Sequence, residues 1–541
     1  MSQTIDQIFL SHAAKNGEQI ALTEAPGPAR LGLSPVPDLS YSAAAAYIRH
    51  MATKFRQCGF NEGDVIVVQL PNIAEAPLLL ISIINAGLVP SLMPSHWRGA
   101  ELGEALVHIN PRAIIAHSSD TSYDPFPAIF EIAAEHMGLR YIYGLGPDLP
   151  DGVTPLSDLS TLISEDMQPP AKEDKAMLRR SGEQLAFIAW TRDENCRTAP
   201  VAYTHLQLMA NAHLLISAAG ITDRLSVLTA YGPTNPVGLI GAFIPWMMEG
   251  GSIHLISSLK QALESKPYND HAVNLALLPE QLAPRLSELE LGDGLLGDAP
   301  HLFLVASTPH SPPPPYQLGS GAGAVTSVVN LNALCLIPRQ TNDYNDEGLL
   351  FLGPQPGPDG DIVDPPFIET RIQGATQKAG SQDDVMRGRL EVNGTAIGFT
   401  NWQPDMTTAR HFNFNNHWEK TGLEATIINQ SLNRLRLEAP ESTVYYGSTP
   451  FSSDELDRLY QTYPGFIDAA AFTIKDATLG ERLLAAIIPT PGEALSYEDF
   501  KKHLLTQNIS PAKIPEKLVT VEEIPRNEDG YVTRSAILSH P

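Results

Sequence analysis

Cysteine is scarce in this chain: its 541 residues include three, Cys58, Cys196 and Cys335. Their odd number and wide spacing argue against a disulfide framework and predict free thiols in a reducing compartment. The amino terminus has no basic segment followed by an apolar run, so we expect no signal peptide. These features predict a cytoplasmic protein.

Positive charge is also in short supply. The chain has 36 Lys and Arg against 61 Asp and Glu, a net charge of −25 at pH 7, and no run of basic residues. Nucleic acids and anionic membranes are bound through clustered Lys and Arg, so neither is an expected partner. His411 and His417 fit neither a helical metal-binding pair nor a zinc motif, and we expect no metal site.

The chain has no uninterrupted apolar run long enough to span a membrane. The uncharged segment 76–95 approaches that length, but Pro77, Asn85, Gly87 and Pro90 interrupt it. Because proline and glycine end or kink helices, the segment predicts a buried helix that turns at Gly87 into a short strand. We expect no membrane span.

Short apolar runs alternate with helical stretches over most of the first 400 residues. The expected helices include residues 205–219, after a Thr204 cap, and residues 239–248. The expected strands are residues 65–70, 113–117, 140–144, 185–191, 226–231, 252–256, 274–278 and 302–307. This alternation predicts an α/β body, residues 1–437, with largely parallel sheets covered by helices.

The pattern changes after about residue 438, where a small α+β domain, residues 438–541, is predicted behind a hinge at residues 438–441. Its expected strands are residues 442–446, 468–474, 483–489 and 517–521, and its expected helices are residues 453–462 and 496–506.

Several stretches follow one another in an order typical of one enzyme family. Residues 39–72 begin with a tyrosine-bearing helix start and end in a strand followed by Leu-Pro-Asn. Residues 84–94 hold an Ala-Gly turn, residues 417–422 read His-Trp-Glu-Lys-Thr-Gly, and residues 513–534 contain Ile-Pro-Arg and a glycine turn. Together they resemble the adenylate-forming superfamily of acyl-CoA synthetases, peptide-synthetase adenylation domains and beetle luciferases, over almost the whole chain.

The resemblance implies a reaction in which ATP activates a carboxylate as an acyl-adenylate, and the acyl group then passes to CoA or a carrier-protein thiol. The family's phosphate loop reads Tyr-Thr-Ser-Gly-Thr-Thr-Gly-x-Pro-Lys-Gly. The corresponding residues here are Trp190, Thr191, Arg192, Asp193, Glu194, Asn195, Cys196, Arg197, Thr198, Ala199 and Pro200. The glycines are missing, Ala199 replaces the lysine, and Asp193 and Glu194 would repel phosphate.

Other family positions are altered as well. In the stretch that begins at Asn332, Leu336 replaces the glutamate that helps to hold Mg²⁺. Leu423 replaces the aspartate that binds ribose, and Tyr531 replaces the lysine that contacts the reacting carboxylate. We therefore expect a degenerate member that has lost ATP-dependent adenylation and needs no cofactor.

Three functions remain open. The first is a pseudoenzyme or repurposed protein that handles acyl groups, acyl-CoA or acyl-carrier protein in lipid or secondary metabolism, beside a catalytically intact pathway enzyme. The second is an ATP-independent acyl-transfer enzyme that uses Cys196 or Cys335 with His205. The third is an active acyl-CoA or acyl-carrier-protein ligase with substitute residues, which would need ATP and Mg²⁺.

Simpler structural roles are also expected for several of these residues. His205 would pack at the start of its helix, Arg192 and Arg197 would pair with Asp193 and Glu194, and Tyr531 would pack across the domain interface. A candidate acyl pocket lies in the apolar segment 233–248, with the residues Gly238, Gly241, Phe243 and Trp246. A buried helix would have the same composition.

Overall fold

The computed structural model describes most of the chain. The described residues are 3–25, 33–34, 36, 38–118, 123–156, 159, 180–193, 197–221, 224–256, 273–282, 301–306, 308–310, 324–339, 350–357, 360–377, 386–400, 402–404, 406, 417–429, 433–440, 442–446, 449–476, 480–492, 496–528 and 530–537. Cys196, Glu194 and His411 lie outside these residues.

A seven-stranded sheet forms the first layer of the body, and five of its six strand pairs are parallel. Its strands, in spatial order, are β7 (Thr154–Pro155), β6 (Tyr141–Leu145), β5 (Ala113–His117), β3 (Val65–Gln69), β4 (Val89–Leu92), β8 (Leu185–Arg192) and β9 (Thr198–Thr204). Only β9 runs antiparallel to its neighbour, because it forms a hairpin with β8.

Alternate residues of β3 point into two separate apolar cores. Ile66 and Val68 pack with residues of α2 (Tyr41–Gln57) and α3 (Glu75–Asn85). Val65 and Val67 pack with residues of α4 (Gly99–Ile109) and α5 (Phe126–Glu135). Both faces of this sheet are therefore covered by helices, as the continuous apolar character of its strands requires.

An eight-stranded, mostly parallel sheet forms the second layer. Its strands, in spatial order, are β15 (Leu336–Arg339), β14 (Val325–Asn330), β13 (His301–Val305), β12 (Leu275–Pro279), β10 (Ser226–Thr229), β11 (Ser252–Leu255), β1 (Ile20–Glu24) and β2 (Leu39–Ser40). The helices α1 (Ile5–Lys15), α7 (His205–Ala219) and α9 (Ile244–Glu249) share one large core with both sheets.

The predicted helix 205–219 is confirmed as α7, which begins after the Thr204 cap and ends at Gly220, where φ is +62°. The predicted helix 239–248 is interrupted. It starts as α8 (Pro236–Gly238), continues as a π-helical turn over Leu239–Phe243, and returns to α-helix in α9.

A six-stranded antiparallel sheet was not expected from the sequence. It orders β16 (Leu350–Phe351), β21 (Arg434–Glu438), β20 (Glu419–Asn429), β19 (Met386–Asn393), β18 (Glu369–Gln377) and β17 (Gly353–Pro354). The sheet completes the body, which we define as the described residues up to β21.

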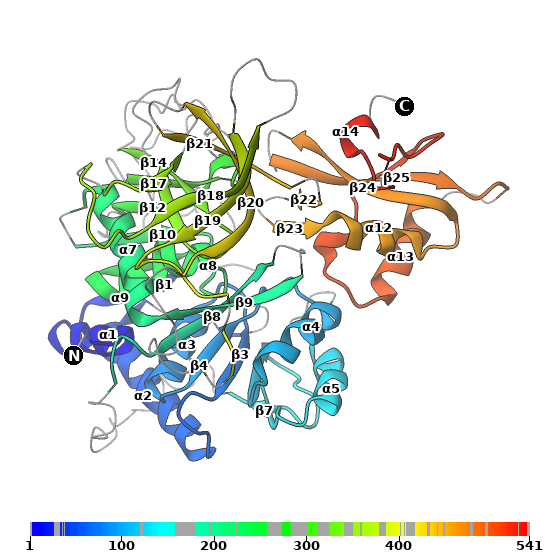
Figure 1. Ribbon diagram of the computed structural model, residues 1–541. Coiled ribbons are helices and arrows are strands. Elements are labelled where there is room, and N and C mark those ends of the chain that lie inside the picture. The colour runs from blue at the N-terminus through cyan, green and yellow to red at the C-terminus, as the bar shows by residue number, and fades with distance from the viewer. Residues whose placement is uncertain are drawn as a thin grey trace.

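The remaining elements form the C-terminal unit, which projects from one side of the body (Figure 1). They are β22 (Thr443–Tyr446), β23 (Thr449–Ser452), α12 (Ser453–Gln461), β24 (Phe466–Asp476), β25 (Gly480–Pro489), α13 (Tyr497–Thr506), a 3₁₀ turn over Pro511–Lys513, β26 (Leu518–Thr520) and α14 (Arg534–Ile537). The chain is thus an α/β body with a smaller α+β unit, as predicted, while the boundary at residue 438 stays a prediction.

The uncharged segment 76–95 lies inside the body. Its helix is α3, its strand is β4, and Gly87 makes the turn between them with φ +84°. Within the described ranges, no helix combines the length and apolar character needed to cross a bilayer.

Candidate functional site

A cleft of about 350 Å³ lies where the body meets the C-terminal unit. The body supplies the end of β8, the loop after β4, the segment after β10 and the turn between β14 and β15, and the C-terminal unit supplies β23 and the residue before the 3₁₀ turn. The residues that line the cleft include His96, Trp97, Glu101, Trp190, Thr191, Arg192, Ala230, Tyr231, Asn330, Asn332, Ala333, Thr449, Pro450, Phe451 and Ser510.

At the phosphate-loop position, the hairpin of β8 and β9 contains an ion pair between Arg197 and Asp193. The backbone N–H of Arg197 donates to Asp193 Oδ1 at 2.8 Å, and its Nε and Nη2 donate to Asp193 Oδ2 at 3.2 and 3.1 Å. The predicted pairing of Arg197 with Asp193 is therefore confirmed. The predicted pairing of Arg192 with Glu194 involves a residue outside the described ranges. Arg192 Nη1 lies 3.6 Å from Glu455 Oε2 of the C-terminal unit.

The positions that carry acids in the family lie in the apolar core. Leu336 is fully buried and Leu423 is 2% exposed. Neither lines the cleft. At the two positions where the family resemblance implies carboxylates for Mg²⁺ and ribose, this chain therefore has buried leucine side chains.

Asn332 does face the cleft, from a tight turn between β14 and β15. Asn332 and Ala333 both have positive φ, +47° and +62°, which is unusual for residues other than glycine. Asn332 Nδ2 donates to the carbonyl of Thr421 at 2.6 Å, and the N–H of Ala333 donates to Asn330 Oδ1 at 2.9 Å. These bonds fix the turn that forms one wall of the cleft.

The structure does not bring Cys335 and His205 together. Cys335 is fully buried, and burial raises the pKa of its thiol well above the ordinary range. His205 lies at the start of α7, where its Nδ1 accepts a hydrogen bond from the N–H of Ile5 at 3.2 Å. Cys335 is thus held as an un-ionised thiol, which makes it a poor nucleophile, and His205 supports packing.

Tyr531 lies outside the cleft, at a turn in the C-terminal unit. Its N–H donates to Asn527 Oδ1 at 2.9 Å, and Gly530 next to it has φ +85°. Its side chain is 61% exposed, so the predicted packing of Tyr531 across the domain interface was wrong.

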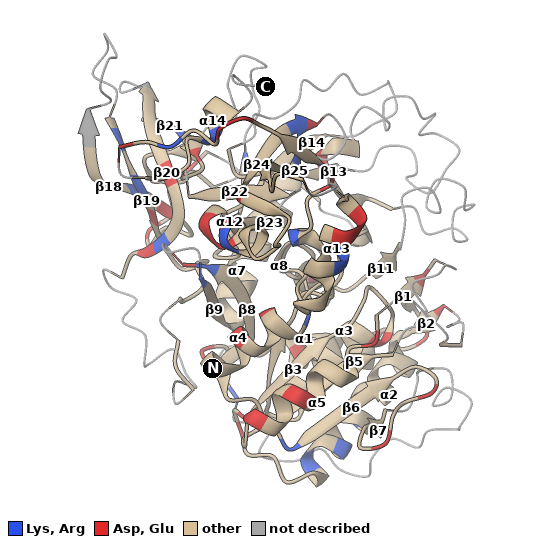
Figure 2. Ribbon diagram, turned by 90° about the vertical axis from the view of Figure 1, so that its right-hand side faces the viewer, with Lys and Arg blue, Asp and Glu red and all other residues tan. Residues whose placement is uncertain are grey.

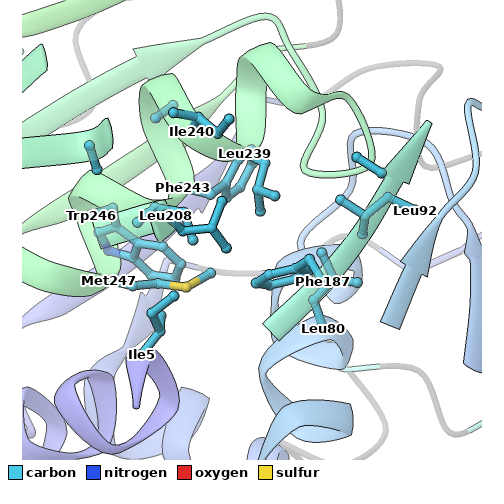
Figure 3. Packing of buried hydrophobic residues seen from close by; sticks show 14 of the residues in the cluster. Ile5, Leu80, Leu92, Phe187, Leu208, Leu239, Ile240, Phe243, Trp246 and Met247 are labelled. Carbon is cyan, nitrogen blue, oxygen red and sulfur yellow. The ribbon is translucent and has the colours of Figure 1, made fainter. Parts of the chain in front are cut away.

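Two of the candidate acyl-pocket residues, Phe243 and Trp246, lie in the core (Figure 3). Phe243 and Trp246 are fully buried, and the Trp246 ring contacts Phe9 with 5.0 Å between centroids. A Cβ added at Gly241 would lie 3.0 Å from Leu277, and one at Gly238 would lie 2.3 Å from a backbone oxygen. Of the predicted pocket segment 233–248, residues 234–237 line the cleft, and they precede the π-helical turn.

Sequence reasoning missed the aromatic wall of the cleft. Trp97 and Trp190 lie side by side with 5.9 Å between ring centroids, and Tyr231 and Phe451 also line the cavity. Trp97 and Tyr231 follow the carboxyl ends of the parallel strands β4 and β10, where ligands bind in open α/β sheets. The position of these two residues after strands was the sequence signal that could have revealed the aromatic wall.

Three buried histidines predict a loss of stability in mildly acidic solution. Burial lowers the pKa of His96, His205 and His301 to about 4, against about 6.5 in the unfolded chain. Protonation therefore favours the unfolded state, so this stability is present above about pH 6.5 and is lost as the pH falls towards 4. For His205, which is 2% exposed, this pKa shift corresponds to roughly 3 kcal/mol. Melting temperatures of the wild type and His205→Gln should diverge at pH 7 and converge at pH 5; parallel curves would contradict this.

The profile of the AMP-binding enzyme family matches residues 9–276. A 2-hydroxy-7-methoxy-5-methyl-1-naphthoate–CoA ligase of Streptomyces carzinostaticus is 23% identical over 97% of this chain and 91% of its own length. A salicylyl-CoA synthase / salicylate adenylyltransferase of a Streptomyces species is also 23% identical, over 90% of this chain and 86% of its own.

Solved structures share the fold over the full length. The amide bond synthetase McbA from Marinactinospora thermotolerans superimposes with a TM-score of 0.71 at 16% identity and covers 99% of both chains. A double mutant of o-succinylbenzoate CoA synthetase from Bacillus subtilis gives 0.69 at 15% identity, over 100% of this chain and 99% of its own. Profile, relatives and fold agree with one another: the chain belongs to the AMP-binding enzymes of the adenylate-forming superfamily, and its relatives there are acyl-CoA and aryl-CoA ligases.

Proposed function

We propose that this protein binds an aryl or acyl thioester in the cleft without forming an adenylate. One observation carries the proposal: the cations of the phosphate-loop hairpin are already paired with protein carboxylates, Arg197 with Asp193 and Arg192 with Glu455. A nucleotide phosphate would have to displace these carboxylates and would meet Asp193 at the loop. Loss of the family's metal and ribose acids supports the same conclusion.

The cleft itself favours an aromatic or other flat apolar acyl group. Trp97, Trp190, Tyr231 and Phe451 offer ring faces, and Asn332 offers an amide for one polar contact. Relatives named as naphthoate and salicylate ligases support an aryl group. The o-succinylbenzoate CoA synthetase with this fold was solved bound with its product analogue OSB-NCoA, which supports a thioester as ligand. The CoA thiol and a carrier-protein thiol remain alternative carriers.

Benzoyl-CoA should stabilise the protein and ATP with Mg²⁺ should not. Binding at a hundredfold excess over the dissociation constant adds about 2.7 kcal/mol of stability, which raises the melting temperature measurably. Ala230→Trp, which fills the cleft, should remove the shift, whereas Tyr531→Ala, outside the cleft, should keep it. Differential scanning fluorimetry measures the shift in melting temperature, and calorimetry measures ligand binding.

The same samples distinguish the other functions. A stable acyl adduct on Cys196 or Cys335, found by mass spectrometry, would favour ATP-independent acyl transfer. Formation of AMP in the presence of an aryl acid, ATP and CoA would favour an active ligase. A lack of stabilisation by benzoyl-CoA, octanoyl-CoA and an acylated carrier protein alike would refute thioester binding.

A further inference from the structure

A chain of four charged side chains connects the body to the C-terminal unit beside the cleft. Arg192 Nη1 lies 3.6 Å from Glu455 Oε2, Lys513 Nζ lies 2.6 Å from Glu455 Oε1, and the same Nζ lies 2.7 Å from Glu101 Oε1. Arg192 and Glu101 belong to β8 and α4 of the body, and Glu455 and Lys513 to the C-terminal unit. The signs alternate, so the chain carries no net charge. Figure 2 shows acidic and basic positions side by side on α12, the helix of Glu455.

The two central groups are removed from water. Glu101 is 1% exposed and Lys513 is 4% exposed. Both oxygens of Glu101 also accept the backbone N–H of Ser510, at 3.1 and 3.0 Å, and Oε2 accepts the N–H of Arg98 at 3.0 Å. Burial by itself raises the pKa of the Glu101 carboxyl, but Lys513 and these donors hold it below its usual value.

A backbone contact fixes the same interface. The N–H of Ala100, at the start of α4, donates to the carbonyl of Asn508 at 3.0 Å. Asn508 and Ser510 come from the turn that carries Lys513 into the interface. One end of α4 is therefore bound to this turn through its main chain and through Glu101.

Buried ion pairs add little to stability compared with apolar residues, yet breaking one by removing a single partner is costly. The effect of such a pair at an interface is to favour one orientation of the two parts that it joins. If the C-terminal unit turned while remaining in contact with the body, Glu101 and Lys513 would be buried without their present partners. The interface is thus specific for the orientation in the structure.

We propose that Arg192, Glu455, Lys513 and Glu101 form a latch that holds the C-terminal unit closed over the cleft in one orientation. The four are positioning residues: they place residues 449–451 and Ser510 as a wall of the cleft. Arg192 lies in the loop that corresponds to the family's phosphate loop. In the family this loop holds a nucleotide, whereas in this protein it binds the C-terminal unit through Arg192. The latch goes beyond the proposed function and does not depend on what the cleft binds.

Single-molecule fluorescence energy transfer in the full-length protein tests the latch. Dyes can be attached through non-canonical side chains at Met137 in the body and Ile467 in the C-terminal unit, which are 92% and 63% exposed. We expect one narrow population in the wild type. Glu101→Gln and Lys513→Met should each raise the ratio of open to closed molecules at least about tenfold. Arg192→Gln should raise this ratio less, because Arg192 lies 3.6 Å from Glu455 and the Glu455 side chain is 34% exposed.

Lys502→Met is the matched control, since Lys502 lies on α13 of the same unit with its side chain 75% exposed. The double variant Glu101→Gln/Lys513→Met should open no further than the more open single variant, because the two changes break the same contact. Cooperative melting of each variant confirms that it is folded. Unchanged distributions in folded Glu101→Gln and Lys513→Met, or two orientations already present in the wild type, would overturn the proposal. Loss of benzoyl-CoA binding would bear only on the proposed function.

Discussion

ATP–pyrophosphate exchange by this protein with aryl acids is expected to be at least about 10⁴-fold slower than by a competent ligase. Removal of one preorganised donor costs about 10²- to 10³-fold, and here the loop glycines, its lysine and two acids are replaced together. Not all of these losses act independently, but two that do, at about 10²-fold each, already give the expected factor of about 10⁴. Arg197 cannot substitute for the lysine without giving up Asp193.

The Streptomyces carzinostaticus naphthoate–CoA ligase, assayed in parallel with its own substrate, is the positive control. An exchange rate within a hundredfold of the rate of that enzyme would contradict the prediction. A micromolar dissociation constant for ATP, measured by calorimetry, would also contradict it. Either result would restore the active-ligase alternative, with substitute residues that the cleft would have to provide.

Trp246→Ala is expected to lower the free energy of unfolding by about 3–5 kcal/mol, because a fully buried tryptophan leaves a large cavity. Trp246 is fully buried against Phe9 and shares the core with α1, α7 and both sheets. Urea denaturation followed by circular dichroism measures the shift in midpoint. Tyr531→Ala, at an exposed turn, should change the stability by less than about 0.5 kcal/mol.

The same variant decides between the two interpretations of segment 233–248. If Trp246 belongs to the core, folded Trp246→Ala protein should bind thioesters with the wild-type affinity. Retained stability together with lost binding would instead assign Trp246 to the acyl pocket.

Local sequence patterns predicted the helices and parallel strands well, for physical reasons that are visible in single elements. Helix α7 has a threonine cap before it and a glycine in the left-handed conformation after it, and both signals lie within the segment. The antiparallel sheet was missed because β21 reads Arg-Leu-Arg-Leu-Glu, a short amphipathic run whose pairing depends on β20 and β16.

Long-range contacts explain what the sequence could not predict about the site. The altered phosphate loop was recognisable from the sequence alone, and so was the pairing of Arg197 with Asp193. The contact of Ser510 with Glu101 joins residues 409 positions apart. No local pattern encodes such a pair, and the burial of Leu336 and Leu423 likewise depends on how distant strands pack.

The paired indoles of the cleft give the protein a built-in optical probe. The chain has five tryptophans. Trp246 is enclosed in the core, Trp402 is 6% exposed and donates to the carbonyl of Met406, and Trp418 stacks under Arg371. Trp97 and Trp190 face the cavity, so an aromatic ligand that stacks on them should quench or shift their emission and leave the other three unchanged. Ligand titrations can therefore be read from intrinsic fluorescence, without a label.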